Sequence, residues 1–535
     1  MPLPVYAGGR EVTAGGPGVP VLAAAPGALR PGWSTLPLPV RLQAAAEKVT
    51  GNPSGHRAED GPHPSCQRHE AWVLKESVKN AGNLSAMDWG EPKGSAVAYR
   101  LTVLGTGYLG TTHAACMADL GFEVLGLDVD ADKVASLQAG HLPIHEPGLE
   151  EILRRNLANG RLRFTTSYRE AAAFGEVHFV CVGTPQKKGE YAADVSYLDA
   201  VIESLAPHLD RECLVVGKST VPVGTAARLA DKLARLSPVG EASELAWNPE
   251  FLREGFAVDD TMNPDRIVLG VRSEKAEKVM REVYASMLEA GTPLVVTDYP
   301  TAELVKVAAN AFLATKISFI NAMAEVCETA HADVKQLSKA LSYDERIGGR
   351  FLNPGLGFGG GCLPKDIRAF MARAGELGAD QALTFLREVD AINMRRRARM
   401  VDLARELTGG SFNGCTVAVL GAAFKPNSDD IRDSPALDVA TSIAAQGGRV
   451  TVYDPIALDN ARRAHPELSY GTSAMEAARD AHVVLLLTEW QEFVDLDPEE
   501  LGSVVAQRKI VDGRNALDAE TWRAAGWHYR ALGRP

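Results

Sequence analysis

The architecture of this chain follows from one segment, Arg100-Leu101-Thr102-Val103-Leu104-Gly105-Thr106-Gly107-Tyr108-Leu109-Gly110. Its first half is a short apolar run that is typical of a buried strand. Its second half is a Gly-X-Gly-X-X-Gly turn that leads into a helix-like stretch. A strand, a glycine-rich turn and a helix in this order predict the first unit of a doubly wound sheet, with a dinucleotide pyrophosphate at the helix N-terminus.

A second strand, predicted at 123–127, ends at Asp128. A carboxylate at that point accepts hydrogen bonds from both ribose hydroxyls and repels a 2′-phosphate, which favours NAD over NADP. Lys133 either reaches the adenosine side or is an ordinary solvated lysine. Thr184 follows a later strand and would border the cofactor. Thr220 lies at the same sheet edge, where it contacts cofactor, substrate or a catalytic water, or else caps a helix.

Strand and helix patterns alternate along most of the chain, as expected of parallel sheets with crossover helices. Further strands are predicted at 177–182, 214–218, 244–247 and 267–270. The stretch 301–331 contains no Gly or Pro and predicts a helix of ~45 Å, too long for one small domain. Helical pattern continues to about residue 407, and a second α/β unit opens at 416–421, with strands at 449–453, 483–487 and 510–512.

The predicted fold class is therefore α/β, with two Rossmann-like doubly wound domains joined by a long central helix and a helical middle domain. The predicted domains are a disordered N-terminal extension (1–97), an NAD-binding domain (98–298), a central helical domain with a cysteine loop (299–408) and a C-terminal domain (409–535). The extension is rich in Gly, Pro, Ala and Ser and lacks the apolar periodicity of a packed core.

Composition excludes several classes of function. A formal net charge of −12 argues against a nucleic-acid or anionic-membrane surface. The seven cysteines form no CxxC pair, so the sequence predicts no disulfide framework and no metal site and fits a reducing cytoplasm. The chain shows no apolar run that looks long enough to span a bilayer, and its N-terminus lacks the features of a signal peptide.

The cysteine loop is the segment Gly357-Phe358-Gly359-Gly360-Gly361-Cys362-Leu363-Pro364-Lys365-Asp366. Its glycines permit close approach of a ligand, and Pro364 suits the first turn of a helix. Cys362 would then lie at a helix N-terminus, which favours a thiolate, with Asp366 on the same helical face. This layout suits covalent catalysis by sulfur. The alternative is a turn followed by a buried core cysteine.

Two more groups of polar residues carry a functional signal. Glu250 and Glu254 lie four residues apart in a bounded loop that follows a strand, although paired acids are more often a solvated helix face. Glu303, Lys306 and Asn310 share one face of the predicted long helix, and their apolar neighbours make burial costly without a polar role.

Together these segments resemble the nucleotide-sugar 6-dehydrogenases of the UDP-glucose/GDP-mannose dehydrogenase family. The resemblance covers about residues 100–525 and rests on the motifs GTGYLG, VGTP, STVPVGT, NPEFLREG, GFGGGCLPKD, FKPNSDDIRDSP, TEWQEF and DGRN, with Lys306 and Asn310 on the long helix. Gly361 stands where many relatives carry a serine.

What this resemblance implies can be placed on individual positions. It implies Cys362 as the nucleophile, and as further catalytic residues Lys306, Asn310, Asp366, Glu250, Glu254 and Thr220. It implies an NAD site at Gly105, Gly107, Tyr108, Leu109, Gly110, Asp128, Lys133, Thr184, Thr220, Glu254 and Arg432. It implies a substrate site at Glu250, Phe251, Leu252, Lys306, Asn310, Phe351, Leu352, Asn353, Gly359, Lys425 and Arg514.

The implied reaction is the four-electron oxidation of UDP-glucose to UDP-glucuronate. A cysteine fits it, because a thiohemiacetal can give up a second hydride to form a thioester that water then hydrolyses. Lys306 and Asn310 would stabilise the oxyanion, Asp366 would help to activate water, and Glu250 or Glu254 would act with Thr220 to position water or accept a proton.

Three alternatives stay open. The first is a GDP-mannose or another nucleotide-sugar dehydrogenase. The second is a two-electron β-hydroxyacid dehydrogenase, which would need neither Cys362 nor a third domain. The third is a binding protein that keeps the fold without the activity. The incomplete glycine motif at 421–425 argues against a second NAD site, and Lys425 and Arg514 would instead bind a diphosphate.

The predicted partners are UDP-glucose, with no nucleic acid and no membrane, and a second copy of the chain. A homodimer or higher homo-oligomer is expected because the long helix carries apolar positions that need a cover.

Overall fold

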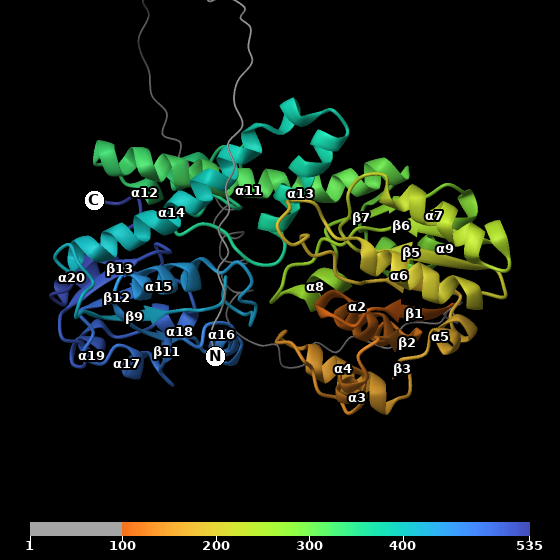
Figure 1. The fold of residues 1–535 in the computed structure, drawn as a ribbon, viewed down its shortest axis with the longest axis horizontal. Coiled ribbons are helices and arrows are strands. Elements are labelled where there is room, and N and C mark those ends of the chain that lie inside the picture. Colours follow the sequence, from red (N-terminus) through yellow and green to blue (C-terminus); the bar gives the residue numbers. More distant parts are fainter. Residues whose placement is uncertain (1–98) are drawn as a thin grey trace, which may run out of the picture. The chain divides into compact units, whose positions relative to one another are not determined.

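The computed structural model describes residues 99–535, which all belong to one compact unit. Two sheets and an intervening helical segment make up these residues (Figure 1). The predicted disordered extension, 1–97, lies outside the described residues.

The first sheet has the strand order β3-β2-β1-β4-β5-β6-β7-β8. Its order reverses between β1 and β4, so the crevice beyond their carboxyl ends is the expected ligand site of such a sheet. Its strands are β1 (Arg100–Leu104), β2 (Glu123–Leu127), β3 (Leu162–Thr165), β4 (Val177–Val180), β5 (Cys213–Gly217), β6 (Ser243–Trp247), β7 (Ile267–Gly270) and β8 (Leu294–Thr297).

The prediction of a wholly parallel sheet is wrong at one position. β7 meets β6 antiparallel through a single residue pair, Trp247 with Gly270, while the other neighbours in this sheet are parallel. The connection between β6 and β7 holds only a six-residue helix, α8 (Ala257–Met262), rather than a full crossover helix. Alternation of strands and helices does not reveal such a reversal.

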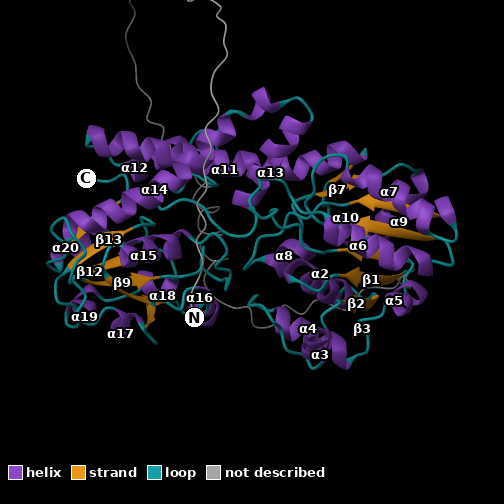
Figure 2. Cartoon of the chain, viewed as in Figure 1, coloured by secondary structure: helices purple, strands orange, loops and turns teal. Residues whose placement is uncertain are grey.

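Helices cover both faces of this sheet (Figure 2). Because successive side chains of a strand point to opposite faces, Leu101 and Val103 enter one core and Leu104 the other. The remaining helices of this part are α2 (Tyr108–Asp119), α3 (Ala131–Gln138), α4 (Leu149–Ala158), α5 (Tyr168–Phe174), α6 (Ser196–Leu205), α7 (Thr225–Leu236), α9 (Glu274–Val283) and α10 (Ala285–Glu289).

The predicted long helix is present as α11 (Tyr299–Ala330) and begins two residues earlier than predicted. Asp298 caps it by accepting the backbone N–H of Thr301, and His331 ends it in a left-handed conformation, φ 56°. It is followed by α12 (Val334–Ser342), α13 (Leu363–Glu376) and α14 (Phe385–Leu407).

The sequence-based prediction that no segment is long and apolar enough to span a bilayer is wrong for α11. Within residues 99–535, it is long and apolar enough to do so by length and composition. It nevertheless packs against α13, α14 and β7, and 44% of its most apolar window is buried by protein. It also carries Glu303, Lys306 and Glu328, each engaged with other parts of the chain. These contacts are those of a core helix.

The second sheet is wholly parallel and has the order β11-β10-β9-β12-β13-β14, the same order as the first six strands of the first sheet. Its strands are β9 (Thr416–Leu420), β10 (Arg449–Tyr453), β11 (Ser469–Tyr470), β12 (Val483–Leu486), β13 (Lys509–Asp512) and β14 (His528–Ala531). Its helices are α15 (Pro435–Ala445), α16 (Leu458–Ala464), α17 (Ala474–Ala477), α18 (Gln491–Val494), α19 (Pro498–Gly502) and α20 (Ala519–Ala524).

The predicted fold class is confirmed: the described chain is α/β, with two Rossmann-like sheets and a long central helix between them in the sequence. The residue numbers of the domain boundaries stay predictions.

Candidate active site

The glycine turn after β1 is built for close packing on one side and for space on the other. A Cβ on Gly110 would lie 1.8 Å from the backbone oxygen of Gly105, so only glycine fits where α2 meets the turn. A Cβ on Gly107 would meet nothing within 4 Å. Leu109 is half-buried and packs against the core on one side of the sheet. The N-terminus of α2 has no side-chain cap, which leaves its amides available to an anion.

Asp128 is placed beside this turn and is held as a carboxylate. Burial acts to raise its pKa, but hydrogen bonds from Lys133 and from the backbone of Thr106 and Asp130 hold the pKa below its usual value. Lys133 Nζ lies 3.0 Å from Asp128 Oδ2. The structure therefore pairs these two predicted cofactor residues with each other.

The loops that follow β4 and β5 are tied together. Thr184 Oγ1 donates to the backbone oxygen of Thr220 at 2.7 Å, and Ser219 Oγ donates to that of Val182 at 2.6 Å. The alternative view of Thr220 as a helix cap is wrong, because Gly224 is the N-cap of α7. Thr220 instead opens onto a pocket.

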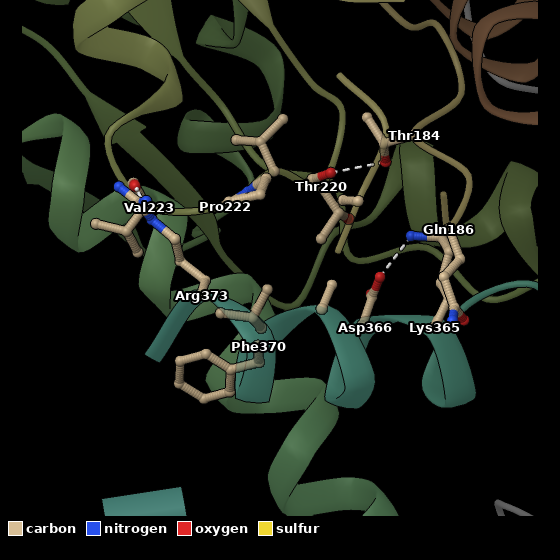
Figure 3. Close-up of a pocket in the computed structure, with 13 residues that line it drawn as sticks. Thr184, Gln186, Thr220, Pro222, Val223, Lys365, Asp366, Phe370 and Arg373 are labelled. Carbon is tan, nitrogen blue, oxygen red and sulfur yellow. Dashed lines mark hydrogen bonds and ion pairs between the residues drawn. The ribbon is translucent and has the colours of Figure 1, made fainter. Parts of the chain in front are cut away.

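This pocket lies between the β4 and β5 loops, α11 and α13 (Figure 3). Asp366 points from α13 toward the loops that carry Thr184 and Thr220. The lining is mostly apolar and consists of Thr184, Gln186, Ala193, Thr220, Val221, Pro222, Val223, Val307, Lys365, Asp366, Ala369, Phe370 and Arg373.

Cys362 is the N-cap residue of α13, and its side chain is exposed. The sequence predicts that this position favours a thiolate, which would mean a lowered pKa. The prediction is wrong, because the net shift of the Cys362 pKa is upward. The protein that surrounds the thiol and the Asp366 carboxylate raise its pKa, and they outweigh the opposite effect of Lys306 and Lys365. The thiol must therefore pass its proton to a base when it reacts.

Asp366 is buried and fixed from two sides. Its Oδ2 accepts a hydrogen bond from Asn310 Nδ2 at 2.6 Å, and its Oδ1 lies 2.5 Å from Lys365 Nζ. Lys306 lies over the ring of Phe251, with Nζ 5.3 Å from the ring centre. The structure thus gathers Cys362, Asp366, Asn310 and Lys306 at the meeting point of α11 and α13.

Glu303, on the same face of α11, does not join them. Its carboxylate accepts the backbone N–H groups of Gly224 and Ala226 at 2.7 and 2.6 Å. It therefore caps α7, a role that the helical spacing alone does not distinguish from a place in the site.

Glu250 and Glu254 have opposite electrostatic environments. Burial acts to raise the pKa of Glu250, but Lys218, with Nζ 3.0 Å from the carboxylate, brings that pKa down to about 2. Burial and the nearby Asp430 raise the pKa of Glu254 to about 7. Glu250 is thus a permanent carboxylate, whereas Glu254 can exchange a proton near neutral pH.

The segment before the cysteine loop is partly core. Phe351 has a left-handed backbone, φ 65°, and Asn353 is exposed, but the side chain of Leu352 is 1% exposed in a cluster with Ile320 and Ala324. A Cβ on Gly359 would lie 2.3 Å from the backbone oxygen of Asp433. Next to it, Asn393 of α14 accepts the N–H of Phe358 at 2.8 Å and donates to its carbonyl at 2.9 Å.

Lys425 and Arg514, which follow strands of the second sheet, lie in different environments. Burial lowers the pKa of Lys425, whose Nζ lies 5.3 Å from the ring centre of Phe424. Arg514 donates to the carbonyls of Leu487, Gly357 and Phe424, at 2.7, 2.9 and 3.2 Å. Arg514 therefore ties the cysteine loop to the second sheet, in addition to any charge that it offers a diphosphate.

Arg432 lies where three segments meet. Its guanidinium pairs with Asp430 at 2.6 Å and reaches Glu254 at 3.3 Å. A Cβ on Gly361 would lie 2.3 Å from the guanidinium carbon of Arg432. The glycine at 361 is thus what allows Arg432 to lie against the residue that precedes Cys362.

Two site residues escaped the sequence analysis. Lys218 directly precedes the Ser219–Thr225 motif, but nothing in the sequence indicates that it is buried against Glu250. Glu146 accepts the hydroxyl of Tyr108 and the N–H of Gly255, next to Glu254. It lies in a Pro- and Gly-bounded turn, where a single acidic residue carries no signal. Among residues 99–535, no group of three or more His, Cys, Asp or Glu side chains is arranged to hold a metal ion, and the six described cysteines are free.

Three family models of the UDP-glucose/GDP-mannose dehydrogenase family match the chain. They are its NAD binding domain at residues 99–288, its central domain at 300–395 and its UDP binding domain at 418–519. The NAD-binding domain of the family is therefore present in this chain.

Individual proteins agree with these models. The chain is 40% identical to the UDP-glucose 6-dehydrogenase of Rhizobium meliloti (strain 1021) over 82% of its own length and 100% of that protein. It is 39% identical to the UDP-glucose 6-dehydrogenase TuaD of Bacillus subtilis (strain 168), over 82% of its own length and 93% of that protein.

A solved UDP-glucose dehydrogenase from the archaeon Pyrobaculum islandicum aligns with a TM-score of 0.75 at 36% identity, over 83% of this chain and 99% of the other. A UDP-D-ManNAc dehydrogenase from Pyrococcus horikoshii aligns with a TM-score of 0.72 at 28% identity, over 81% of this chain and 99% of the other. The models, the relatives and the solved structures lead to one conclusion: the chain belongs to the UDP-glucose/GDP-mannose dehydrogenase family.

Proposed function

We propose that the protein is an NAD-dependent UDP-glucose 6-dehydrogenase, which converts UDP-glucose, two NAD⁺ and water into UDP-glucuronate, two NADH and three protons. The observation that carries this proposal is the meeting of Cys362 with Asp366, Asn310 and Lys306 at the N-terminus of α13. The choice of substrate is supported by the names of the relatives, which align with this chain over nearly their full length.

The NAD site proposed here consists of the glycine turn, Tyr108, Leu109, Asp128, Lys133, Thr184, Thr220, Glu254 and Arg432. Its residues fit that cofactor, because Gly107 leaves space beside uncapped helix amides and Asp128 is a carboxylate at the end of β2. Bound NAD⁺ supplies the hydride acceptor for each of the two oxidations. Asp128 would have to exchange part of its bond with Lys133 for the ribose hydroxyls.

Cys362 acts after the first oxidation. Its sulfur forms a bond to C6 of the aldehyde, its proton leaves to a base, and the carbonyl oxygen gains a proton to give a thiohemiacetal. Loss of the second hydride from C6, with the hydroxyl proton passing to a base, gives a thioester. Attack of water on the thioester breaks the C–S bond, releases the carboxylate and returns the thiol. Lys306 and Asn310 would stabilise negative charge on the oxygen at C6.

Glu254 suits the proton transfers better than Glu250 does. Its pKa of about 7 lies near the operating pH, whereas the pKa of about 2 at Glu250 makes that carboxylate a poor base. We therefore assign proton exchange to Glu254, and the orientation of water or substrate to Glu250 and Thr220, with Asp366 helping to activate water.

The substrate site takes its remaining residues from the cysteine loop and the second sheet: Phe251, Leu252, Phe351, Leu352, Asn353, Gly359, Lys425 and Arg514. Leu352 would contribute through its backbone, since its side chain lies in the core. The segments 98–298, 299–408 and 409–535 would then hold the cofactor, the cysteine loop and the UDP group respectively.

NADH formation tests the proposal directly. Purified protein is incubated with NAD⁺ and UDP-glucose, and in parallel with GDP-mannose or UDP-N-acetylmannosamine, and NADH is counted per sugar consumed. Two NADH per UDP-glucose, with little signal from the other two, is the expected result. Preference for another sugar nucleotide would replace the substrate assignment, and absence of NADH with all three would contradict the proposed function.

We also propose that the protein is a cytoplasmic homodimer or a higher homo-oligomer. Phe312, Phe319 and Val326 are 66%, 47% and 57% exposed and follow each other at seven-residue spacing along α11, a pattern that fits a second copy of the same helix. Light scattering after size exclusion should give at least twice the chain mass, and Phe319→Glu should lower it to that of one chain.

A further inference from the structure

The carboxylate of Glu146 accepts hydrogen bonds from several segments, and the proposed mechanism gives it no role. It is 5% exposed and lies in the turn between α3 and α4. Its Oε2 accepts the hydroxyl of Tyr108 and the N–H of Gly255 at 2.7 Å, and its Oε1 accepts the N–H of Ala257 at 2.7 Å. One side chain thus joins the glycine turn to the loop 248–256 and the start of α8.

The loop held in this way meets the segment that connects β9 to α15. A Cβ on Gly255 would lie 2.7 Å from the backbone oxygen of Asn427, so the two segments are in close contact there. The adjacent Glu254 accepts Ser428 Oγ at 3.2 Å and Arg432 Nη2 at 3.3 Å. Arg432 in turn lies against Gly361, next to Cys362.

The two acids of this loop are held independently. Lys218 holds Glu250 through a buried ion pair of 3.0 Å, and Glu250 also accepts the N–H groups of Phe251 and Leu252. The N–H groups of Gly255 and Ala257 both donate to Glu146. The N–H of Gly255 has a second acceptor, the hydroxyl oxygen of Tyr108, at 2.9 Å. We therefore expect a change at Glu146 to disturb the backbone next to Glu254 and to leave the ion pair of Glu250 intact.

We propose that Glu146 is a positioning residue, which with Tyr108 fixes Glu254 against Ser428 and Arg432 and so couples the glycine turn to the cysteine loop. This inference rests on the proposed function for its kinetic consequences. Its structural content, a link from the glycine turn through loop 248–256 to residues 427–432, stands without it.

A double-mutant cycle of Glu146→Gln and Tyr108→Phe tests the link. In Tyr108→Phe the carboxylate still accepts from both Gly255 and Ala257. In Glu146→Gln the single amide oxygen can accept from Ala257 while the tyrosine oxygen accepts from Gly255. In the double variant one amide oxygen remains for both N–H groups, so one of these two buried amides has no acceptor. We expect each single change to lower kcat by less than about 5-fold and the double change to lower it by more than the product of the two, within the roughly 5- to 150-fold range of an unsatisfied buried donor.

The matched control is Asp518→Asn. Asp518 also caps a six-residue helix, α20, by accepting the N–H and hydroxyl of Thr521. This change is expected to lower thermal stability only. A positioning role for Glu146 also predicts that the double variant shifts the acid limb of the pH profile of kcat. A purely structural role predicts the same fractional loss at every pH, and that result would overturn the proposal.

Hydrogen exchange provides a readout without activity. Amides of 254–257 and of the distant segment 427–432 are expected to exchange faster in the double variant, and both segments are expected to stay unchanged in Asp518→Asn. Faster exchange at 254–257 alone would refute the coupling. If the wild-type protein formed no NADH from UDP-glucose, the proposed function would fail, and the exchange experiment would still decide on the link.

Discussion

The protein environment governs the ionisation of the two groups at the centre of the proposed chemistry. The protein around the thiol and the Asp366 carboxylate raise the pKa of Cys362, and burial with Asp430 raises that of the Glu254 carboxyl. In the proposed mechanism the protonated thiol needs a base, and a carboxyl that titrates near neutrality can accept that proton.

Replacing Cys362 by serine should separate the two oxidations. Without the sulfur, no thiohemiacetal or thioester of the same kind forms, so the reaction stops or is trapped at an aldehyde or covalent stage. We expect at most one NADH per UDP-glucose and a loss of full turnover on the order of 10³-fold or more. Cys415→Ser, at a cysteine that donates only to the carbonyl of Ser411, is the matched control. Full turnover by Cys362→Ser would refute the role of the sulfur.

Glu254→Gln should change how stability depends on pH. The folded-state pKa of Glu254, about 7, lies above its ordinary value of 4.5, so the folded protein binds this proton more tightly than the unfolded chain does. The contribution of Glu254 is therefore complete below about pH 4.5 and is lost as the pH rises through about 7. Glutamine cannot lose a proton, and so Glu254→Gln should gain stability relative to wild type between about pH 5 and about pH 8.

Urea unfolding of both proteins at those two pH values measures this difference. Parallel changes in the two proteins would show that Glu254 titrates normally in the folded state. Asp518→Asn is the control without a change between these two pH values. Hydrogen bonds from Thr521 lower the pKa of Asp518 below 3.8, so this carboxyl is ionised in the folded and unfolded states at both about pH 5 and about pH 8.

At the scale of single elements, the β1–turn–α2 unit allows binding and packing to be tested separately. Gly110→Ala would bring a methyl group to 1.8 Å from the Gly105 oxygen, whereas Gly107→Ala meets no atom within 4 Å and has an ordinary φ of −74°. We expect Gly110→Ala to lower the thermal midpoint and NAD⁺ affinity together. Gly107→Ala should keep wild-type stability and raise the KM for NAD⁺ by about 10-fold or more. A stable Gly110→Ala with normal KM would contradict this account.

Sequence patterns predicted the central elements better than the edges. The strands 100–104, 123–127, 267–270 and 449–453 are observed with the predicted ends, because buried strands carry continuous apolar runs. β3, β8, β11 and β14 were not predicted. β3 and β8 are only partly buried, and β11 has two residues, so none shows a clear pattern. Side-chain pairs such as Lys218 with Glu250 depend on tertiary packing, which no local pattern encodes.

Across the whole described chain, the two sheets share one strand order but differ at the position that a dinucleotide would need. Asp454 follows β10 as Asp128 follows β2. Its Oδ2 accepts the N–H groups of Ala422 and Ala423 and of the Trp490 indole, and its Oδ1 accepts those of Ile456 and Ala457. The residue is fully buried, so no oxygen remains for a ribose.

This difference predicts one NAD⁺ site per chain. Calorimetric titration of the protein with NAD⁺ should give a stoichiometry of one, and Asp128→Asn should weaken that binding, with about 10-fold lower affinity for the loss of a charged hydrogen-bond acceptor. Asp454→Asn should leave the affinity unchanged and lower stability instead. A second binding event per chain would overturn the assignment of the second sheet.

The contacts that hold the cysteine loop affect the order in which parts of the chain fold. The backbone of Gly357 and Phe358 is held by Arg514, 157 positions later in the chain, and by Asn393, 35 positions later. Contacts between such distant segments form late, after helices and neighbouring strands. During refolding from denaturant, helical circular dichroism should therefore recover before the thiol of Cys362 gains its native reactivity, and a chain truncated before residue 514 should never gain it.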